Sequence, residues 1–185
     1  EMDYLKPYVN FLKKNLDLKK SLKVVFDCSN GTAGLVVRQL KIKNFKIINA
    51  KPDGRFPAHG PNPMAEGAMD DLAKAVLKQK ADLGAVFDSD GDRAFFIDNL
   101  GRPIRSDVAA LFIAQGIRGA VVLDLLAGYP VQELLKDRKI FECRVGSYFM
   151  KKITKEKKVK FGAENSGHFY FPVEGTVFDS GILAA

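Results

Sequence analysis

Short runs of Val, Ile and Phe alternate with amphipathic stretches along this 185-residue chain. Such alternation is typical of βα units, in which helices cover a mainly parallel sheet. The length suits one large domain or two small ones. A turn sequence at residues 100–103, followed by a helix start at Ser106, places a boundary near residue 105. We therefore predict two similar three-layer α/β domains with mixed, mainly parallel sheets, over residues 1–104 and 105–185, the second incomplete at its C-terminus.

Periodicity and turn residues predict the individual elements. The predicted strands cover residues 23–27, 45–49, 83–88, 94–98, 120–124, 140–144, 159–162 and 168–171. The predicted helices cover residues 3–15, 34–40, 64–80, 107–116, 131–137 and 147–157. Asp179 and Ser180 have the side chains of helix N-caps, and too few residues follow them for a stable helix. We therefore expect the chain to be part of a longer protein.

Composition excludes several classes of protein. With 46% hydrophobic and 28% charged residues, the chain can build a core and does not resemble a disordered protein. No apolar run approaches the roughly 18 residues of a membrane helix, and the first residues lack the pattern of a signal or transit peptide. Cys28 and Cys143 share no metal-binding spacing. We expect reduced, buried thiols in a soluble, cytoplasmic protein without a membrane partner.

The net charge of +7 raises the question of whether the protein binds nucleic acid. The basic excess, however, lies in lysine runs such as Lys13-Lys14 and residues 151–160, where no aromatic residues alternate with the lysines to stack on bases. Solvated helix faces explain these runs better, so we expect no nucleic-acid partner. A basic chain also suits an anionic small molecule such as a phosphorylated sugar.

The most informative stretch carries three carboxylates on alternate positions, Asp88, Asp90 and Asp92, directly after a predicted buried strand. Such carboxylates repel one another unless a cation lies between them, although a solvated acidic turn is the alternative. An EF-hand is excluded, because Arg93 and Asn99 occupy the positions that require glycine and glutamate. The open ligand shell predicts Mg²⁺ bound to phosphate oxygens, and Arg93 could pair with the same phosphate.

A second polar motif, GAENSGH, covers residues 162–168. Glu164 and Ser166 lie two residues apart and could bind neighbouring sugar hydroxyls, while His168 could donate to a hydroxyl or a phosphate. The same residues could also form a plain hairpin turn, and the two interpretations are compatible.

Three apolar runs end in aspartate followed by a glycine-containing turn, at Asp27, Asp88 and Asp124. Ligands of open α/β sheets bind beyond the carboxyl ends of strands, so these residues are candidates for the site, although aspartate is also a common turn former. His59, in a proline-rich loop, is interpreted as a turn or hydrogen-bonding histidine rather than a catalytic base.

The acidic stretch resembles the metal loop of the α-D-phosphohexomutases, and residues 162–168 are similar to their sugar-recognition loop. Residues 28–34 and 53–63 extend the resemblance along the chain, over the second and most of the third of four domains. The resemblance implies an isomerase of the phosphomannomutase/phosphoglucomutase type. Such an enzyme interconverts hexose 6-phosphate and hexose 1-phosphate through a phosphoserine on its first domain.

The resemblance also implies residue roles. Asp88, Asp90 and Asp92 would hold Mg²⁺ against the phosphoserine, with Arg93 at the phosphate. The expected substrate-binding residues are Glu164, Ser166 and His168. Arg144 is added from the sequence itself, because it could supply part of the positive charge that the chain lacks at the two departures described below. The chain has neither a Ser-His-Asn-Pro nucleophile loop nor an Arg-rich phosphate loop, so its partners would be domains 1 and 4 of the parent chain and a phosphorylated hexose. Without those domains, we predict no activity for the chain alone.

Two positions depart from the resemblance. Leu125-Leu126 stands where many family members carry a basic residue and a serine, and Ser147 stands where a histidine is common. Two other functions remain open from the residues. One is a haloacid-dehalogenase-like phosphatase, although Asp92 stands where that family has Thr or Val, and the other is a non-catalytic phosphosugar-binding module.

Overall fold

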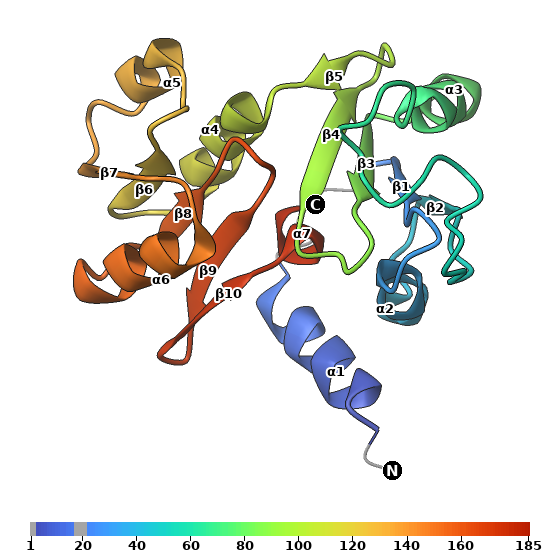
Figure 1. Ribbon diagram of the computed structural model, residues 1–185, viewed down its shortest axis with the longest axis horizontal. Coiled ribbons are helices and arrows are strands. Elements are labelled where there is room, and N and C mark those ends of the chain that lie inside the picture. Colours follow the sequence, from blue (N-terminus) through green and yellow to red (C-terminus); the bar gives the residue numbers. More distant parts are fainter. Residues whose placement is uncertain (1–2, 17–21) are drawn as a thin grey trace. The chain divides into compact units, whose positions relative to one another are not determined.

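The computed structural model describes residues 3–16 and 22–185, which divide into two compact units. The first unit comprises the described residues up to Gly91, residues 95–103 and Ala185, and the second comprises residues 92–94 and 104–184. Each unit contains one five-stranded sheet. Both sheets are mixed with mainly parallel pairing, as three-layer α/β domains require, so the predicted fold class is confirmed (Figure 1).

The first sheet has the strand order β2-β1-β3-β4-β5. Its strands β1 and β2, and β1 and β3, run parallel, with Val24 opposite Phe45 and Leu83. The elements around this sheet are α1 (Leu5–Asn15), β1 (Val24–Asp27), α2 (Ala33–Leu40), β2 (Phe45–Ile48), α3 (Asp70–Gln79), β3 (Leu83–Phe87), β4 (Ala94–Asp98) and β5 (Pro103–Ile104).

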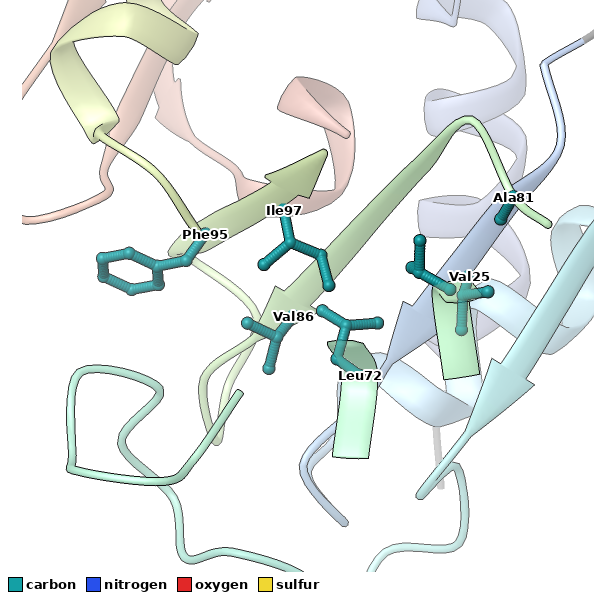
Figure 2. Packing of buried hydrophobic residues seen from close by; sticks show 7 residues of the cluster. Val25, Leu72, Ala81, Val86, Phe95 and Ile97 are labelled. Atoms are coloured by element: carbon teal, nitrogen blue, oxygen red, sulfur yellow. The ribbon is translucent and has the colours of Figure 1, made fainter. Parts of the chain in front are cut away.

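The core of the first unit forms where α3 packs on β1 and β3. Figure 2 shows Leu72 of α3 among Val25, Val86 and Ile97, which come from three strands. All four side chains are fully buried. Burial of each such side chain contributes about 1.5–3 kcal/mol of hydrophobic free energy. The strands therefore end against a rigid core, and the loops that follow them start from defined positions.

The second sheet has the order β10-β9-β8-β6-β7. Strand β6 pairs in parallel with β7 and β8, whereas β9 is antiparallel to β8 and β10. Helix α6 packs on all five strands of this sheet and buries Met150 among them, and α4 packs on β8. The elements are α4 (Ser106–Gly116), β6 (Val121–Asp124), α5 (Tyr129–Leu134), β7 (Ile140–Cys143), α6 (Ser147–Glu156), β8 (Phe161–Ala163), β9 (Phe169–Val173), β10 (Thr176–Asp179) and α7 (Gly181–Ala184).

Several sequence-based boundaries are wrong. The helix predicted for residues 64–80 begins only at Asp70, because the preceding residues form turns and Gly67 has a φ of +76°. Strands β5 and β10 were not predicted. Asp179 ends β10 instead of capping a helix, whereas Ser180 does cap α7, since its Oγ accepts the amide proton of Leu183 at 3.1 Å.

Within residues 3–16 and 22–185, none of the helices has both the length and the hydropathy that crossing a bilayer requires.

Candidate functional site

The acidic loop, residues 88–92, connects β3 to β4. Asp88 is buried at the end of β3, Asp90 is exposed and Asp92 is intermediate. Gly91 has a φ of +78°, and its amide donates to Asp88 Oδ1 at 3.1 Å. A residue with a Cβ would be strained at this φ, so the glycine allows the chain to turn back over the Asp88 carboxylate.

The three aspartates each present a carboxylate oxygen, and these oxygens lie within 4.8 Å of one another. Oxygen ligands at this spacing suit a hard divalent cation such as Mg²⁺, which typically binds a few carboxylates and completes its shell with water or phosphate oxygens. The residues present therefore fit the cation predicted from the sequence. Among the described residues, no other group of three or more His, Cys, Asp or Glu side chains comes together in this way.

Asp92, Arg93 and Ala94 belong to the second unit and meet the hairpin between β8 and β9. The amide of Ala94 donates to the Gly167 carbonyl at 3.0 Å, and Arg93 forms an isolated antiparallel bridge with His168. His168 Nε2 lies 3.3 Å from Asp92 Oδ2, and Arg93 Nε lies 4.0 Å from Asp92 Oδ1. The structure thus brings one predicted metal ligand together with two other predicted site residues.

The recognition loop, residues 162–168, forms the turn between β8 and β9, as the hairpin interpretation required. The amide of Glu164 donates to the His168 carbonyl at 2.9 Å, and the amide of Gly167 donates to the Glu164 carbonyl at 3.0 Å. At the tip, Ser166 Oγ lies 3.0 Å from His168 Nδ1. Both side chains are only partly buried. Because their polar atoms lie this close together, one ligand could contact both.

Glu164 is placed differently, because its side chain is only 2% exposed. The amide of Gly146 donates to Glu164 Oε1 at 2.7 Å, and the hydroxyl of Tyr170 donates to Oε2. Burial and the hydrogen bond to Glu164 raise the pKa of the Tyr170 phenol, so it remains protonated and able to donate. Glu164 would bind a sugar hydroxyl through a remaining lone pair or by exchanging one of these two donors.

The structure places the remaining predicted residues as follows. The Arg144 guanidinium lies 3.4 Å from the centroid of the Phe149 ring, in a cation–π contact. Ser147, one of the two departures, donates from Oγ to Asp179 Oδ2 at 3.3 Å. At the other departure, the amide of Leu126 donates to Asp124 Oδ1 at 3.1 Å.

The three strand-end aspartates share one local role. Asp27, Asp88 and Asp124 are all buried, and each accepts a hydrogen bond from an amide in the turn that follows its strand. Asp124 also accepts from the amide of Asn165 at 2.8 Å, and burial raises the pKa of its carboxyl group. The turn-forming interpretation therefore describes all three, and of these only Asp88 also belongs to the carboxylate cluster.

Sequence reasoning missed the role of Tyr170 and the hydrogen-bond partner of His59. Tyr170 lies within a predicted strand and gives no local signal, because its hydroxyl meets Glu164 only after the hairpin forms. His59 was expected to be a hydrogen-bonding histidine, and it does bond, but its partner Asp27 lies 32 residues earlier. The sequence could not reveal that pairing, since nothing local links the two residues.

Comparison with family models gives one match to each half of the chain. Residues 6–101 match alpha/beta/alpha domain II of phosphoglucomutase/phosphomannomutase, and residues 109–185 match alpha/beta/alpha domain III.

Individual proteins show the same likeness. The phosphomannomutase of Methanocaldococcus jannaschii is 32% identical over 194 residues, covering 100% of this chain and 43% of the relative. A solved phosphoglucomutase/phosphomannomutase family protein from Burkholderia thailandensis has a TM-score of 0.87 at 23% identity, covering 98% of this chain and 42% of that one. The N-acetylphosphoglucosamine mutase of Aspergillus fumigatus, solved in complex with GlcNAc-6P and magnesium, has a TM-score of 0.61 at 17% identity, covering 100% and 47%. The chain thus spans less than half the length of these proteins.

Proposed function

This chain belongs to the phosphoglucomutase/phosphomannomutase family, and from that premise we propose that it supplies two domains of a Mg²⁺-dependent phosphohexomutase. The parent enzyme would interconvert hexose 6-phosphate and hexose 1-phosphate of the mannose or glucose type. The observation that carries the proposal is the cluster of Asp88, Asp90 and Asp92 oxygens within 4.8 Å of one another. Residues 1–104 would form the domain with the metal loop and residues 105–185 the domain with the recognition loop.

The acidic loop would hold Mg²⁺ through its three carboxylates. When bound, the cation neutralises charge on a transferring phosphoryl group. Arg93, directly after the loop, would contact the same phosphate, because a guanidinium can donate two parallel hydrogen bonds to phosphate oxygens. Asp92 would have a second role, since its carboxylate also lies beside His168.

Substrate recognition is assigned to Ser166, His168, Glu164 and Arg144. Ser166 and His168 would make the first contacts, because they lie at the tip of the recognition loop and are less buried than Glu164. Glu164 would accept from a sugar hydroxyl, and paired polar contacts of this kind discriminate strongly between substrates. Arg144 would attract the phosphate of the substrate from its position on the Phe149 ring.

The nucleophile would come from outside this chain. A phosphoserine on domain 1 and a phosphate-binding loop on domain 4 would be its partners within the parent protein. Positioning of the reacting groups, together with electrostatic stabilisation, supplies most of the catalysis in phosphoryl transfer. Cys28 and Cys143, which are both buried and not joined in a disulfide, support a cytoplasmic location for the parent.

Two measurements test the proposal. Isothermal titration of the chain with Mg²⁺ should give weak, saturable binding that is lost in Asp88→Asn, whereas Asp71→Asn, on the exposed surface of α3, should bind as the unchanged chain does. The purified chain should not convert mannose 6-phosphate or glucose 6-phosphate. Absence of Mg²⁺ binding would refute the metal site, and detectable conversion would refute the need for the missing domains.

A further inference from the structure

A fully buried carboxylate lies at the end of β1, on a strand next to the one that leads into the acidic loop. Asp27 is 0% exposed. Its oxygens accept hydrogen bonds from the amide of Ser29 at 2.9 Å and from Asn49 Nδ2 at 3.0 Å. His59 Nε2 lies 3.2 Å from Asp27 Oδ2. Burying a carboxylate away from water costs free energy unless hydrogen-bond donors surround it. Ser29, Asn49 and His59 supply these donors and so allow Asp27 to be buried.

His59 makes its polar contact through one nitrogen only. Its side chain is 6% exposed, and within the part of the chain that the structure describes its Nδ1 is buried with no hydrogen-bond partner. Because an ionised carboxylate only accepts, the proton of the 3.2 Å contact lies on Nε2 of His59. The imidazole is therefore held in place by Asp27, and Asp27 in turn depends on the Nε2 proton.

The segment after Asp27, residues 28–32, connects this cluster to the acidic loop. Ser29 Oγ donates to the carbonyl of Phe87, directly before Asp88. The amide of Thr32 donates to the Ser89 carbonyl at 2.9 Å, and Thr32 Oγ1 donates to the Asp90 carbonyl at 3.3 Å. Residues 28–32 thus anchor three successive parts of the acidic loop and its entry, the carbonyl groups of Phe87, Ser89 and Asp90.

Two residues of this segment have a left-handed backbone conformation, which residues other than glycine rarely adopt. Ser29 and Asn30 have φ angles of +49° and +54°. Backbone in this region persists only where its surroundings hold it. The backbone of Ser29 is held by Asp27, whose Oδ1 accepts the Ser29 amide proton. This bond adds to the one from the Ser29 hydroxyl to the Phe87 carbonyl.

We propose that His59 is a positioning residue for the acidic loop, acting through Asp27 and residues 28–32 to keep Asp88 and Asp90 in the arrangement that binds a divalent cation. This inference rests on the metal site of the proposed function. His59 touches no ligand in this role. It donates to Asp27, Asp27 orders Ser29, and Ser29 and Thr32 hold the carbonyl groups of the acidic loop.

The test compares two isosteric replacements of His59. Glutamine can place its amide nitrogen near the Nε2 position, whereas asparagine reaches only the Nδ1 position, so His59→Gln can donate to Asp27 and His59→Asn cannot. Mg²⁺ titration should show affinity weakened by about tenfold in His59→Asn, as is common when a group that supports metal ligands is lost. Affinity should be largely recovered in His59→Gln. Val76→Ala, a core truncation in α3, should destabilise the fold and leave Mg²⁺ affinity unchanged.

Amide hydrogen exchange, measured in the absence of metal, tests whether His59 orders the acidic loop independently of whether the loop binds Mg²⁺. The Thr32 amide, bonded to Ser89, should exchange faster in His59→Asn than in His59→Gln, while the amide of Val25 in β1 should exchange alike in both. If the unchanged chain binds no Mg²⁺, the proposed function fails, and the exchange result alone then decides whether His59 orders the loop. Equal Thr32 exchange in the two variants would overturn the inference in either case. Where the unchanged chain does bind Mg²⁺, equal Mg²⁺ affinities in the two variants would overturn it as well.

Discussion

The hydroxyl of Tyr170 donates a hydrogen bond to Oε2 of Glu164 beneath the recognition loop. Tyr170 is fully buried and Glu164 nearly so, and the other oxygen of Glu164 accepts from the amide of Gly146. The Glu164 carboxylate therefore lies away from water with one donor on each oxygen. His168 Nδ1 also lies 3.7 Å from Oε2, which is beyond hydrogen-bond distance. Loss of either donor therefore leaves one oxygen of a buried carboxylate without its hydrogen bond, which is among the costlier defects in a protein interior.

Tyr170→Phe should lower the free energy of unfolding by about 1–3 kcal/mol, because it removes a hydrogen bond to a buried charged group. Urea unfolding at neutral pH measures the change. The matched control is Tyr148→Phe, which removes the same atom from a side chain that is 68% exposed and should alter stability by less than about 0.5 kcal/mol. Equal stabilities of the two variants would mean that the Tyr170 hydroxyl does not support Glu164.

Mg²⁺ should stabilise the chain, since a ligand that binds only the folded state raises the free energy of unfolding by about 2.7 kcal/mol at a hundredfold excess over its dissociation constant. Thermal melting with Mg²⁺ and with EDTA measures this difference. Asp90→Asn should lose the response to Mg²⁺. In EDTA it should melt no lower than the unchanged chain, because it relieves repulsion among the clustered carboxylates of Asp88, Asp90 and Asp92. Full retention of the Mg²⁺ response would remove Asp90 from the metal site.

The stability that His59 contributes should fall as pH rises above about 6.5. The hydrogen bond to Asp27 raises the pKa of His59, burial opposes this, and the charges of Asp27 and Asp71 add to the increase. Below 6.5 both the folded and the unfolded chain hold the proton, and the contribution is complete. Above 6.5 the unfolded chain loses the proton first, so the contribution declines as pH passes through the folded pKa.

Urea unfolding between pH 6 and pH 8 measures this dependence, with His59→Gln as the reference that cannot titrate. The excess stability of the unchanged chain over His59→Gln should be larger at pH 6 than at pH 8. A difference that stays constant or grows with pH would contradict a raised pKa for His59 in the folded chain.

Cys28 should not react with a thiol reagent such as DTNB while the chain is folded. Burial raises the pKa of the Cys28 thiol to about 12, with the charge of Asp27 as a smaller cause, and only the thiolate is nucleophilic. The variant Cys143→Ser isolates Cys28, because the chain has two cysteines. One thiol should then be labelled in urea and none in buffer at pH 8. Rapid labelling in buffer would show that the end of β1 opens readily.

Local patterning predicted most elements of the fold. The apolar runs around Val25, Val86 and Val122 became central strands, because a parallel strand covered on both faces is apolar throughout. Strand β10 was missed, since its exposed and half-buried residues alternate and form no apolar run. The helix start was misplaced at residue 64 because apolar spacing alone does not reveal the interruption at Gly67.

The sequence by itself determined the acidic loop, because Asp88, Asp90 and Asp92 are near neighbours in the chain and a single glycine turn brings their oxygens together. Only the tertiary structure decided which groups support that loop and the recognition loop. His59 reaches Asp27 across 32 residues, and the Tyr170 hydroxyl reaches Glu164 only through antiparallel pairing of β8 and β9. The physical reason is that a charge cluster within one turn depends on local geometry, whereas donors for a buried carboxylate are placed by the packing of distant elements.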